Sequence, residues 1–479
     1  MDLIKTLQDP HLVASFQHFF GIRRVGTPGS NKKYINGDQF GGASASYSHT
    51  KEPTPSLTKH YLNDQSRIQG LQLCRKCDRL TETKTRKTHT RQDSAASAAS
   101  DGSNGSGRSW MSMLLGENTG GTEGSMEEDN TASEAEPEEN AYRIKDRFWC
   151  HLLYHLFFFA TSLGGELFYS VFFCFWSWNV DGAVLRRVMV IWMITMYIGQ
   201  ALKDILKVPR PASPPVIRLD PRWQLEYGLP STHAMVGAAM PFSILILTLN
   251  RYQLDWGWGL AIAVTWCTCV CLSRLYLGMH SVLDVLCGLM LVTVLLVMIL
   301  PWVDVLDHLA LTHPASPLIS FTLTVAMVVC YPATDRWTPA RGDTTVIVGV
   351  GCGSLLGSWA NYQLGIIREP SLPPPYSVIW PTLNMIGLSL LRTILGLVII
   401  LAVKAIFKSL SFATICALLQ VKAEDYMNKT GGITVRRRLV VELFYKFITY
   451  IAIGFTVVYT SPMAFRLIGI ERPTFYTEI

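Results

Sequence analysis

Residues 257–277 read GWGLAIAVTWCTCVCLSRLYL and residues 282–302 read VLDVLCGLMLVTVLLVMILPW, and only GMHS separates the two runs. Each run is almost entirely apolar over about 20 residues, the length that an α-helix needs to cross the hydrocarbon core of a bilayer. The pair therefore predicts two membrane-spanning helices joined by a short connection.

Apolar runs of the same kind continue in both directions along the chain. Hydrophobic residues make up 49% of the 479 residues and charged residues only 16%, against about 25% charged residues in soluble domains. The sequence therefore predicts an all-α fold, a polytopic transmembrane helical bundle of about 8–10 spans. The candidate spans cover residues 152–178, 188–206, 234–249, 257–277, 282–302, 318–331, 344–365, 385–406 and 439–459.

Some of these spans carry polar residues. Glu166 lies near the centre of the first run beside Gly164 and Gly165, so that run is either one tilted span or a broken pair of helices. The last two runs contain Arg392, Lys404, Glu442 and Lys446. Ionisable groups at such positions normally face the interior of the bundle or the membrane interface, and we expect the same here.

The spans divide the chain into three parts. Residues 1–145 are polar and rich in Ser, Gly, Thr and charge, so we expect a mostly disordered N-terminal tail. Residues 146–305 are expected to form a catalytic transmembrane core, and residues 306–479 to add C-terminal transmembrane helices.

A short amphipathic helix is predicted near residues 9–20 of the tail. Asp9 can cap it, Pro10 suits the first helical position and Gly21 can end it. Its apolar residues Leu12, Phe16, Phe19 and Phe20 would share one face. Such a segment either lies on the membrane or stays disordered and recruits a partner.

Several classes of site are disfavoured by the composition. The net charge is only +6 and the basic residues do not cluster with aromatic ones, so no nucleic-acid partner is expected. Most of the 11 cysteines lie in or beside apolar segments and are expected to pack as small hydrophobes. Cys74 and Cys77 form half of a zinc site with no second pair nearby, so neither a metal site nor another cofactor is expected.

Polar motifs stand at the ends of consecutive apolar runs. The first places Lys203 seven residues before Arg210, next to Pro209 and Pro211. Both cations can converge on one point, although two lysine- or arginine-type side chains that snorkel to the interface would look the same. In the second, Ser231 and Thr232 resemble capping residues of the next helix and precede His233. The free N–H groups of a helix start attract an oxyanion.

The third motif consists of Arg274, His280 and Asp284. His280 and Asp284 are four residues apart, so on a helix they share one face, and the carboxylate can hold one ring nitrogen and leave the other free. Each motif alone has an ordinary structural reading. Together they bring cations, a hydroxyl and two histidines to one side of the membrane.

The order and spacing of the motifs resemble the type-2 phosphatidic acid phosphatase superfamily. Residues 207–216, KVPRPASPPV, and residues 275–281, LYLGMHS, are similar to the sphingosine-1-phosphate phosphatases in particular. Thr232 stands where the wider superfamily commonly has Gly, and it too resembles the sphingosine-1-phosphate phosphatases.

The resemblance implies a metal-independent lipid phosphate monoesterase of sphingolipid metabolism. Lys203, Arg210, Arg274, Ser231 and Thr232 would bind the substrate phosphate. His280 would attack phosphorus to give a phosphohistidine, with Asp284 orienting its ring. His233 would protonate the leaving alkoxide and then activate water.

The family also implies a multi-pass protein of the endoplasmic reticulum membrane whose catalytic face points to the lumen. Its substrates would be sphingosine-1-phosphate and related long-chain base phosphates in the bilayer. Two alternatives stay open: a broad-range lipid phosphate or polyprenyl diphosphate phosphatase, and a scaffold or transporter that retains the motif residues. The sequence leaves the oligomeric state open.

The membrane sidedness read from charge is not consistent throughout. Arg186 and Arg187 put the loop before the second span in the cytosol and the motifs on the other side. Residues 436–438, three arginines, would then face the lumen if every span is real. Either one span is miscounted or residues 412–421 form a re-entrant piece. We also expect a cytosolic tail, with no glycan on Asn104.

Overall fold

The computed structural model describes residues 2–24, 142–220, 223–333, 338–370, 372–421, 426 and 435–479. In these ranges the chain is mostly helical, and its sheet is a pair of short antiparallel strands, β1 (Ile22–Arg24) and β2 (Tyr142–Ile144). Every candidate span lies on helices, the first on two of them, so the predicted all-α class is confirmed. The helices before α10 are α1 (Asp2–Gln8), α2 (Pro10–Phe19), α5 (Phe148–Ser162), α6 (Glu166–Asn179), α7 (Gly182–Leu206), α8 (Thr232–Leu249) and α9 (Trp256–Tyr276). The remaining helices are α10 (Val282–Thr312), α11 (Ser316–Val329), α12 (Ala340–Gln363), α13 (Leu383–Leu419), α15 (Val435–Phe455), the π-helix η2 (Thr456–Thr460), α16 (Ser461–Ile468) and the 3₁₀-helix η3 (Pro473–Thr477).

The described helices make this a multi-pass membrane protein. Six of them are long and apolar enough to cross a bilayer: α7, α8, α9, α10, α13 and the continuous run Val435–Ile468. The helices α5 and α6 pass the same test together but are bent by 62°, and counted as one span they make seven. The first apolar run is therefore the broken pair of helices, not the single tilted span. α11 is shorter, with 14 residues.

α12 is long enough to span but is less apolar than the six spanning segments, and its packing explains why. Gly349, Gly353 and Gly357 recur every four residues along the face that meets α15 and η2. A Cβ atom on Gly353 would lie 2.0 Å from the carbonyl oxygen of Ile451. Small residues at this spacing let two helix backbones approach closely inside a membrane. α12 therefore belongs to the interior of the bundle, where close packing takes the place of apolar bulk.

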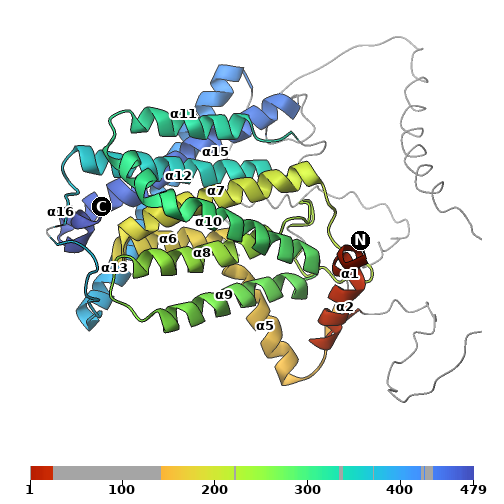
Figure 1. The fold of residues 1–479 in the computed structure, drawn as a ribbon. Helices are drawn as coiled ribbons and strands as arrows, with labels where there is room; N and C mark the ends of the chain where they lie inside the picture. The colour runs from red at the N-terminus through yellow and green to blue at the C-terminus, as the bar shows by residue number, and fades with distance from the viewer. Residues whose placement is uncertain are drawn as a thin grey trace, which may run out of the picture. The chain divides into compact units, whose positions relative to one another are not determined.

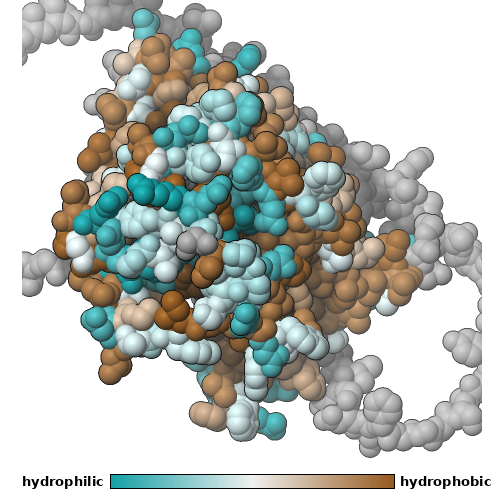
Figure 2. Space-filling model, turned by 60° about the vertical axis from the view of Figure 1, so that its left-hand side comes forward, coloured by the Kyte–Doolittle hydropathy of each residue, from teal (hydrophilic) through white to brown (hydrophobic). Residues whose placement is uncertain are grey.

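Figure 1 shows α7, α8, α10 and α12 running side by side, with α9 and α5 along one flank and α11 and α15 along the other. The largest buried hydrophobic cluster lies among α6, α7, α8, α10, α12 and α15. Figure 2 shows a polar patch with hydrophobic surface around it on the face turned toward the viewer. A bundle that meets water at its ends and lipid along its sides is expected to look like this.

Three of the charged residues inside the last spans, Arg392, Glu442 and Lys446, face the interior, one of the two predicted locations. Lys446 lies 2.9 Å from Glu442 and 3.9 Å from Asp343 on α12. Arg392 is buried and donates a hydrogen bond to the hydroxyl of Ser389. The re-entrant piece considered for residues 412–421 is not observed, because α13 continues unbroken to Leu419.

The short N-terminal helix is confirmed, but its apolar residues divide between two environments. Asp9 caps α2 by accepting a hydrogen bond from the backbone N–H of His11, and Gly21 follows the helix with φ of +95°. Phe16 and Phe20 pack into the cluster that contains Phe157 and Tyr276, whereas Phe19 is 80% exposed. α2 is therefore docked on one end of the bundle, near α9 (Figure 1).

Residues 25–141 lie outside the described part of the chain. They hold most of the predicted disordered tail of residues 1–145, the half zinc site of Cys74 and Cys77, and Asn104. The pairing of β1 with β2 places the two ends of this segment next to each other.

Candidate active site

The three motifs meet at one end of the bundle. Lys203 lies in the last turn of α7, Ser231 caps the start of α8, Arg274 lies in the last turn of α9 and Ser281 caps the start of α10. Hydrogen bonds join one motif to the next: Lys203 Nζ donates to Thr232 Oγ1 at 2.8 Å, and the backbone N–H of Ser231 donates to the carbonyl of Asp284 at 3.1 Å. The motifs thus converge at one end of the helices, as predicted.

The cations of the first motif point inward. α7 ends at Leu206, and Lys207 adopts a left-handed conformation that turns the chain into the Pro209–Pro211 segment. Arg210 folds back, so that its Nη1 donates to the carbonyl of Met279 at 2.7 Å and lies 3.3 Å from Nε2 of His280. Lys203 and Arg210 are 1% and 7% exposed, so the snorkelling interpretation of this pair is wrong.

The second motif forms a helix start with buried hydroxyls. Ser231 Oγ accepts the backbone N–H of Ala234 at 3.5 Å, as an N-capping residue does. His233 is half-buried, and its ring meets the edge of Trp223 with centroids 5.9 Å apart. Gly164, at the break between α5 and α6, lies so close that a Cβ atom there would be 2.9 Å from Cδ2 of His233. The bend of the first span therefore fits around the histidine.

Arg274 of the third motif is 1% exposed and donates from Nη1 to the hydroxyl of Thr161 on α5 at 2.6 Å. This contact ties the end of α9 to the end of α5. The guanidinium therefore has a fixed position beside the histidines.

His280 does not use Asp284 as its hydrogen-bond partner. Its Nδ1 lies 2.9 Å from the carbonyl oxygen of Gly228 and 3.7 Å from Oδ2 of Asp284. That carboxylate oxygen instead accepts the backbone N–H of Ser281 at 2.8 Å, and the two residues form a capping box at the start of α10. Asp284 thus lies close to the ring, as predicted, but the hydrogen-bond partner of the ring is Gly228, because His280 precedes the helix and the i, i+4 face does not apply to it.

The hydrogen bond to Gly228 fixes the tautomer of His280. A carbonyl oxygen only accepts, so Nδ1 carries the proton and Nε2 keeps its lone pair. His280 is buried, and burial together with Arg210, Arg274, Lys203 and His233 holds its pKa well below the usual 6.5. The ring is therefore neutral near pH 7, with the lone pair of Nε2 directed toward the arginine of the first motif.

Sequence reasoning missed three contributors to this site: Glu226, Gly228 and Thr161. Glu226 Oε2 accepts from Lys203 Nζ at 2.8 Å and lies 3.7 Å from Nη2 of Arg210. Glu226 is the only acidic residue between Asp220 and Ser231, a signal that could have drawn attention to it. The roles of Gly228 and Thr161 depend on a backbone carbonyl and a long-range contact, which no local pattern reveals.

An apolar groove of about 410 Å³ lies between α5 and α9. Leu156, Phe159, Ala160 and Leu163 line it from α5, and residues between Trp258 and Cys269 line it from α9. Ala160 directly precedes Thr161, which binds Arg274, so the groove reaches the cationic end of the bundle. Its size and lining suit the hydrocarbon part of a lipid.

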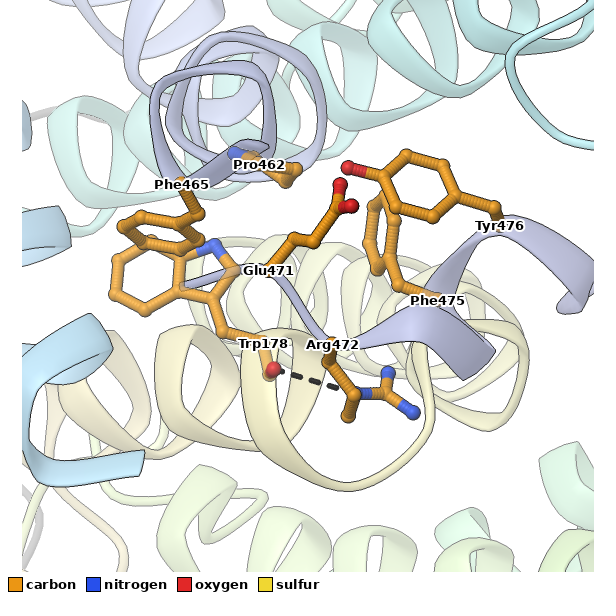
Figure 3. A pocket seen from close by; sticks show the side chains of 7 residues that line it. All are labelled: Trp178, Pro462, Phe465, Glu471, Arg472, Phe475 and Tyr476. Carbon is orange, nitrogen blue, oxygen red and sulfur yellow. Dashed lines mark hydrogen bonds between the residues drawn. The ribbon is translucent and has the colours of Figure 1, made fainter. Parts of the chain in front are cut away.

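A second pocket lies at the opposite end of the bundle. Figure 3 shows it between Trp178 at the end of α6, Pro462 and Phe465 on α16, and the C-terminal residues Glu471, Arg472, Phe475 and Tyr476. Arg472 donates to the carbonyl oxygen of Trp178 at 3.3 Å and pairs with Glu478. The pocket encloses about 10 Å³, roughly the space of one water molecule. The pocket is a small gap where the C-terminal segment packs against α6 and α16. It lies about 30 Å from Lys203, measured along α7.

Among the described residues, no three His, Cys, Asp or Glu side chains gather as they would around a metal ion. The groups that do gather are the cations Lys203, Arg210 and Arg274 with His233 and His280. Cations and imidazoles of this kind suit a bound phosphate ester.

Comparison with known proteins agrees with this geometry. The model of the PAP2 superfamily matches residues 185–307, which contain all three motifs. Sphingosine-1-phosphate phosphatase 1 of Rattus norvegicus is 41% identical over 320 residues, 67% of this chain and 73% of the relative. Sphingosine-1-phosphate phosphatase 2 of Mus musculus is 40% identical over 341 residues, 71% of this chain and 93% of the relative. Sphingosine-1-phosphate phosphatase 2 of Homo sapiens is 39% identical over 331 residues, 69% and 80% of the two chains.

No solved structure shows significant similarity to the chain. The relatives are covered over more than two thirds of their length at about 40% identity, and the superfamily match contains the catalytic end of the bundle. The chain is therefore a phosphatase of the PAP2 superfamily and belongs to the sphingosine-1-phosphate phosphatase family.

Proposed function

We propose that this protein hydrolyses sphingosine-1-phosphate and related long-chain base phosphates in the endoplasmic reticulum membrane, through a phosphohistidine on His280. The observation that carries the proposal is the neutral His280 ring, whose Nε2 keeps a lone pair 3.3 Å from Nη1 of Arg210. A lone pair beside phosphate-binding cations is what a nucleophile needs in order to reach phosphorus.

Binding neutralises the substrate before it reacts. Lys203, Arg210 and Arg274 offset the charge of the phosphate dianion, which otherwise repels a nucleophile. The N-terminus of α8, with Ser231 and Thr232, adds N–H and hydroxyl donors. The groove between α5 and α9 takes the hydrocarbon chain, so the phosphate reaches the cations from the membrane side.

In the first step, Nε2 of His280 attacks phosphorus while the ester P–O bond breaks. His233 gives its proton to the leaving alkoxide, which departs as the free long-chain base. The carbonyl of Gly228 holds the Nδ1 proton, and the Asp284 carboxylate 3.7 Å away stabilises the positive ring. Water then attacks the phosphohistidine and loses a proton to His233, which releases inorganic phosphate and restores His280.

Phosphate release by the detergent-purified protein tests the proposal. Sphingosine-1-phosphate, lysophosphatidate, phosphatidate and a polyprenyl diphosphate are compared side by side, with and without excess chelator. We expect the highest kcat/KM for sphingosine-1-phosphate, no dependence on added metal, and inhibition by vanadate, whose trigonal bipyramidal adduct mimics the transition state. Equal rates on all four lipids would favour a broad-range phosphatase, and a strict need for magnesium would contradict the mechanism.

A further inference from the structure

Glu226 places a carboxylate among the cations that bind phosphate. Its side chain is 3% exposed, with Oε2 at 2.8 Å from Lys203 Nζ and 3.7 Å from Arg210 Nη2. The other oxygen, Oε1, is equally buried and accepts no hydrogen bond within the described structure. A buried carboxylate oxygen is normally hydrogen-bonded, so the second oxygen points to a donor that arrives with the substrate.

A negative group at this position works against a bare phosphate. A phosphate held by Lys203 and Arg210 would lie within a few ångströms of the Glu226 carboxylate, where like charges repel strongly because the site is buried. A cation placed between the two anions would remove the repulsion. A long-chain base phosphate carries such a cation, an ammonium group on the carbon next to the one that bears the phosphate ester.

The chain offers Glu226 little other reason to sit here. Arg210 is already held by two backbone carbonyls, those of Glu226 and Met279, so the carboxylate is not needed to anchor it. Thr232 also accepts from Lys203 at 2.8 Å, so the lysine keeps a partner without the carboxylate.

We propose that Glu226 binds the ammonium group of the substrate through Oε1 and thereby selects amino-bearing long-chain phosphates over phosphates that lack the amine. The inference rests on the proposed function, since it concerns the same site. It makes Glu226 a specificity-determining residue, while the bond-breaking steps stay with the two histidines.

Glu226→Gln provides the test, because it keeps the size of the side chain and removes its charge. The purified variant and the wild type are assayed on sphingosine-1-phosphate and on octadecyl phosphate, an alkyl phosphate of similar chain length without an amine. We define the substrate ratio as kcat/KM for sphingosine-1-phosphate divided by kcat/KM for octadecyl phosphate. We expect this ratio to fall by roughly 10- to 100-fold in the variant, the range of a hydrogen bond between charged groups. The KM for sphingosine-1-phosphate should rise. The KM for octadecyl phosphate should fall, because the cluster of Lys203, Arg210 and Arg274, here called the cradle, becomes more positive.

Two other roles for Glu226 give different results. If it only positions Lys203, both substrates should lose kcat/KM equally. If it only blocks the empty cradle, both should gain equally. Either outcome, with the ratio unchanged, overturns the proposal.

Asp204→Asn is the matched control. Asp204 is a carboxylate 2% exposed and next to Lys203 in sequence, but it accepts from the hydroxyl of Tyr331 at 2.8 Å and lies outside the cradle. The substrate ratio should stay at the wild-type value in this variant. An equal fall in both variants would reflect the general loss of a buried negative charge and would also overturn the proposal.

The wild type alone gives a further check that needs no folded variant. It should prefer sphingosine-1-phosphate to octadecyl phosphate. If it hydrolyses both equally well, the inference about Glu226 fails while the proposed function stands. If it hydrolyses octadecyl phosphate but not sphingosine-1-phosphate, the proposed function itself fails.

Discussion

At the scale of single residues, the two histidines of the site differ in their surroundings. His280 is fully enclosed and its Nδ1 is held by the carbonyl of Gly228, whereas His233 is half-buried at the start of α8. The first arrangement suits a nucleophile with one free nitrogen, and the second suits a group that exchanges protons with the leaving group and water.

Alanine variants of the two histidines should therefore fail in different ways. His280→Ala should abolish turnover and any trapped phosphoenzyme, because no neighbouring group can replace the nucleophile. His233→Ala should lose roughly 10²- to 10⁴-fold on the lipid, yet still form phosphoenzyme from p-nitrophenyl phosphate, whose leaving group needs little protonation. Rapid acid quenching with labelled substrate measures both. A labelled phosphoenzyme in His280→Ala but not in His233→Ala would exchange the two roles.

The buried neutral state of His280 predicts a pH dependence of stability. Its pKa is about 6.5 in the unfolded chain and well below that in the fold, so below pH 6.5 the unfolded state binds the extra proton and folding stability falls. His280→Gln removes this loss. Relative to the wild type, the free energy of unfolding of His280→Gln should rise by up to about 1.4 kcal/mol for each pH unit below 6.5.

Thermal unfolding in detergent at pH 7 and pH 5 measures that shift. His11→Gln, at an exposed position of α2, is the matched substitution. If the wild type and His280→Gln lose stability equally on acidification, His280 takes up its proton in the fold without cost, and the neutral nucleophile is no longer supported.

Much of the site, but not all of it, could be predicted from the sequence at this scale. The cations and histidines lie in runs whose residue types and spacing are themselves the signal. Glu226, Gly228 and Thr161 act through a buried ion pair, a backbone carbonyl and a contact between α5 and α9, and such relations arise only when distant segments meet. The missing hydrogen bond between Asp284 and His280 has a related reason: a spacing of four residues suggests a shared helix face, but α10 begins after His280.

At the scale of elements, α2 holds together the loop after Arg210 and the end of α9. Gln17 is 1% exposed and makes three hydrogen bonds: its Nε2 donates to the carbonyls of Ile217 and Tyr276, and its Oε1 accepts from the N–H of Ile217. The side chain thus joins the segment after Arg210 to the end of α9. Capping residues and an apolar face predicted a helix here, but they gave no sign of the hydrogen bonds of Gln17, because these join it to segments distant in the sequence.

Replacing Gln17 should loosen both loops at once. Gln17→Leu leaves buried backbone groups without partners, at about 1–3 kcal/mol for each group. We expect a lower thermal midpoint and a lower kcat, measured on the purified protein. Gln8→Leu, the same change at an exposed position of α1, should match the wild type. Wild-type behaviour in Gln17→Leu would mean that α2 does not brace the site.

The groove between α5 and α9 predicts a separate effect on lipid substrates. Ala261 lines the groove and is exposed, so Ala261→Phe should fill part of it without disturbing the core. Overfilling an apolar site costs about 1–3 kcal/mol, so the kcat/KM for sphingosine-1-phosphate relative to p-nitrophenyl phosphate should fall by on the order of tenfold. Val294→Phe, on the exposed face of α10, is the control. An equal fall in both variants would show a general response to bulk at the lipid surface.

At the scale of the whole molecule, the fold links the tail to the catalytic end. α2 docks beside the site, and the pairing of β1 with β2 brings the chain back to the same end before α5 begins. The sequence predicts a cytosolic tail and a lumenal site, whereas this pairing predicts that the tail starts and ends on the same side of the membrane as the site. Arg186 and Arg187, on which the sidedness prediction rests, pair with Asp307 and Asp304, so their charge is largely neutralised.

Labelling of single cysteines in sealed vesicles should reveal this arrangement. Leu225 is 52% exposed in the loop before α8, and Leu254 is 42% exposed in the connection after it. α8 has 18 residues, about 27 Å of helix, so the two positions should lie on opposite sides of the membrane. With a membrane-impermeant maleimide, Leu225→Cys and Leu254→Cys should react from opposite sides, above the background of the natural cysteines. A peptide tag inserted next to Asn104 should share the side of Leu225→Cys. A tag that reports the side of Leu254→Cys instead would mean that α2 does not dock on the catalytic end in the membrane, and the role of Gln17 would fall with it.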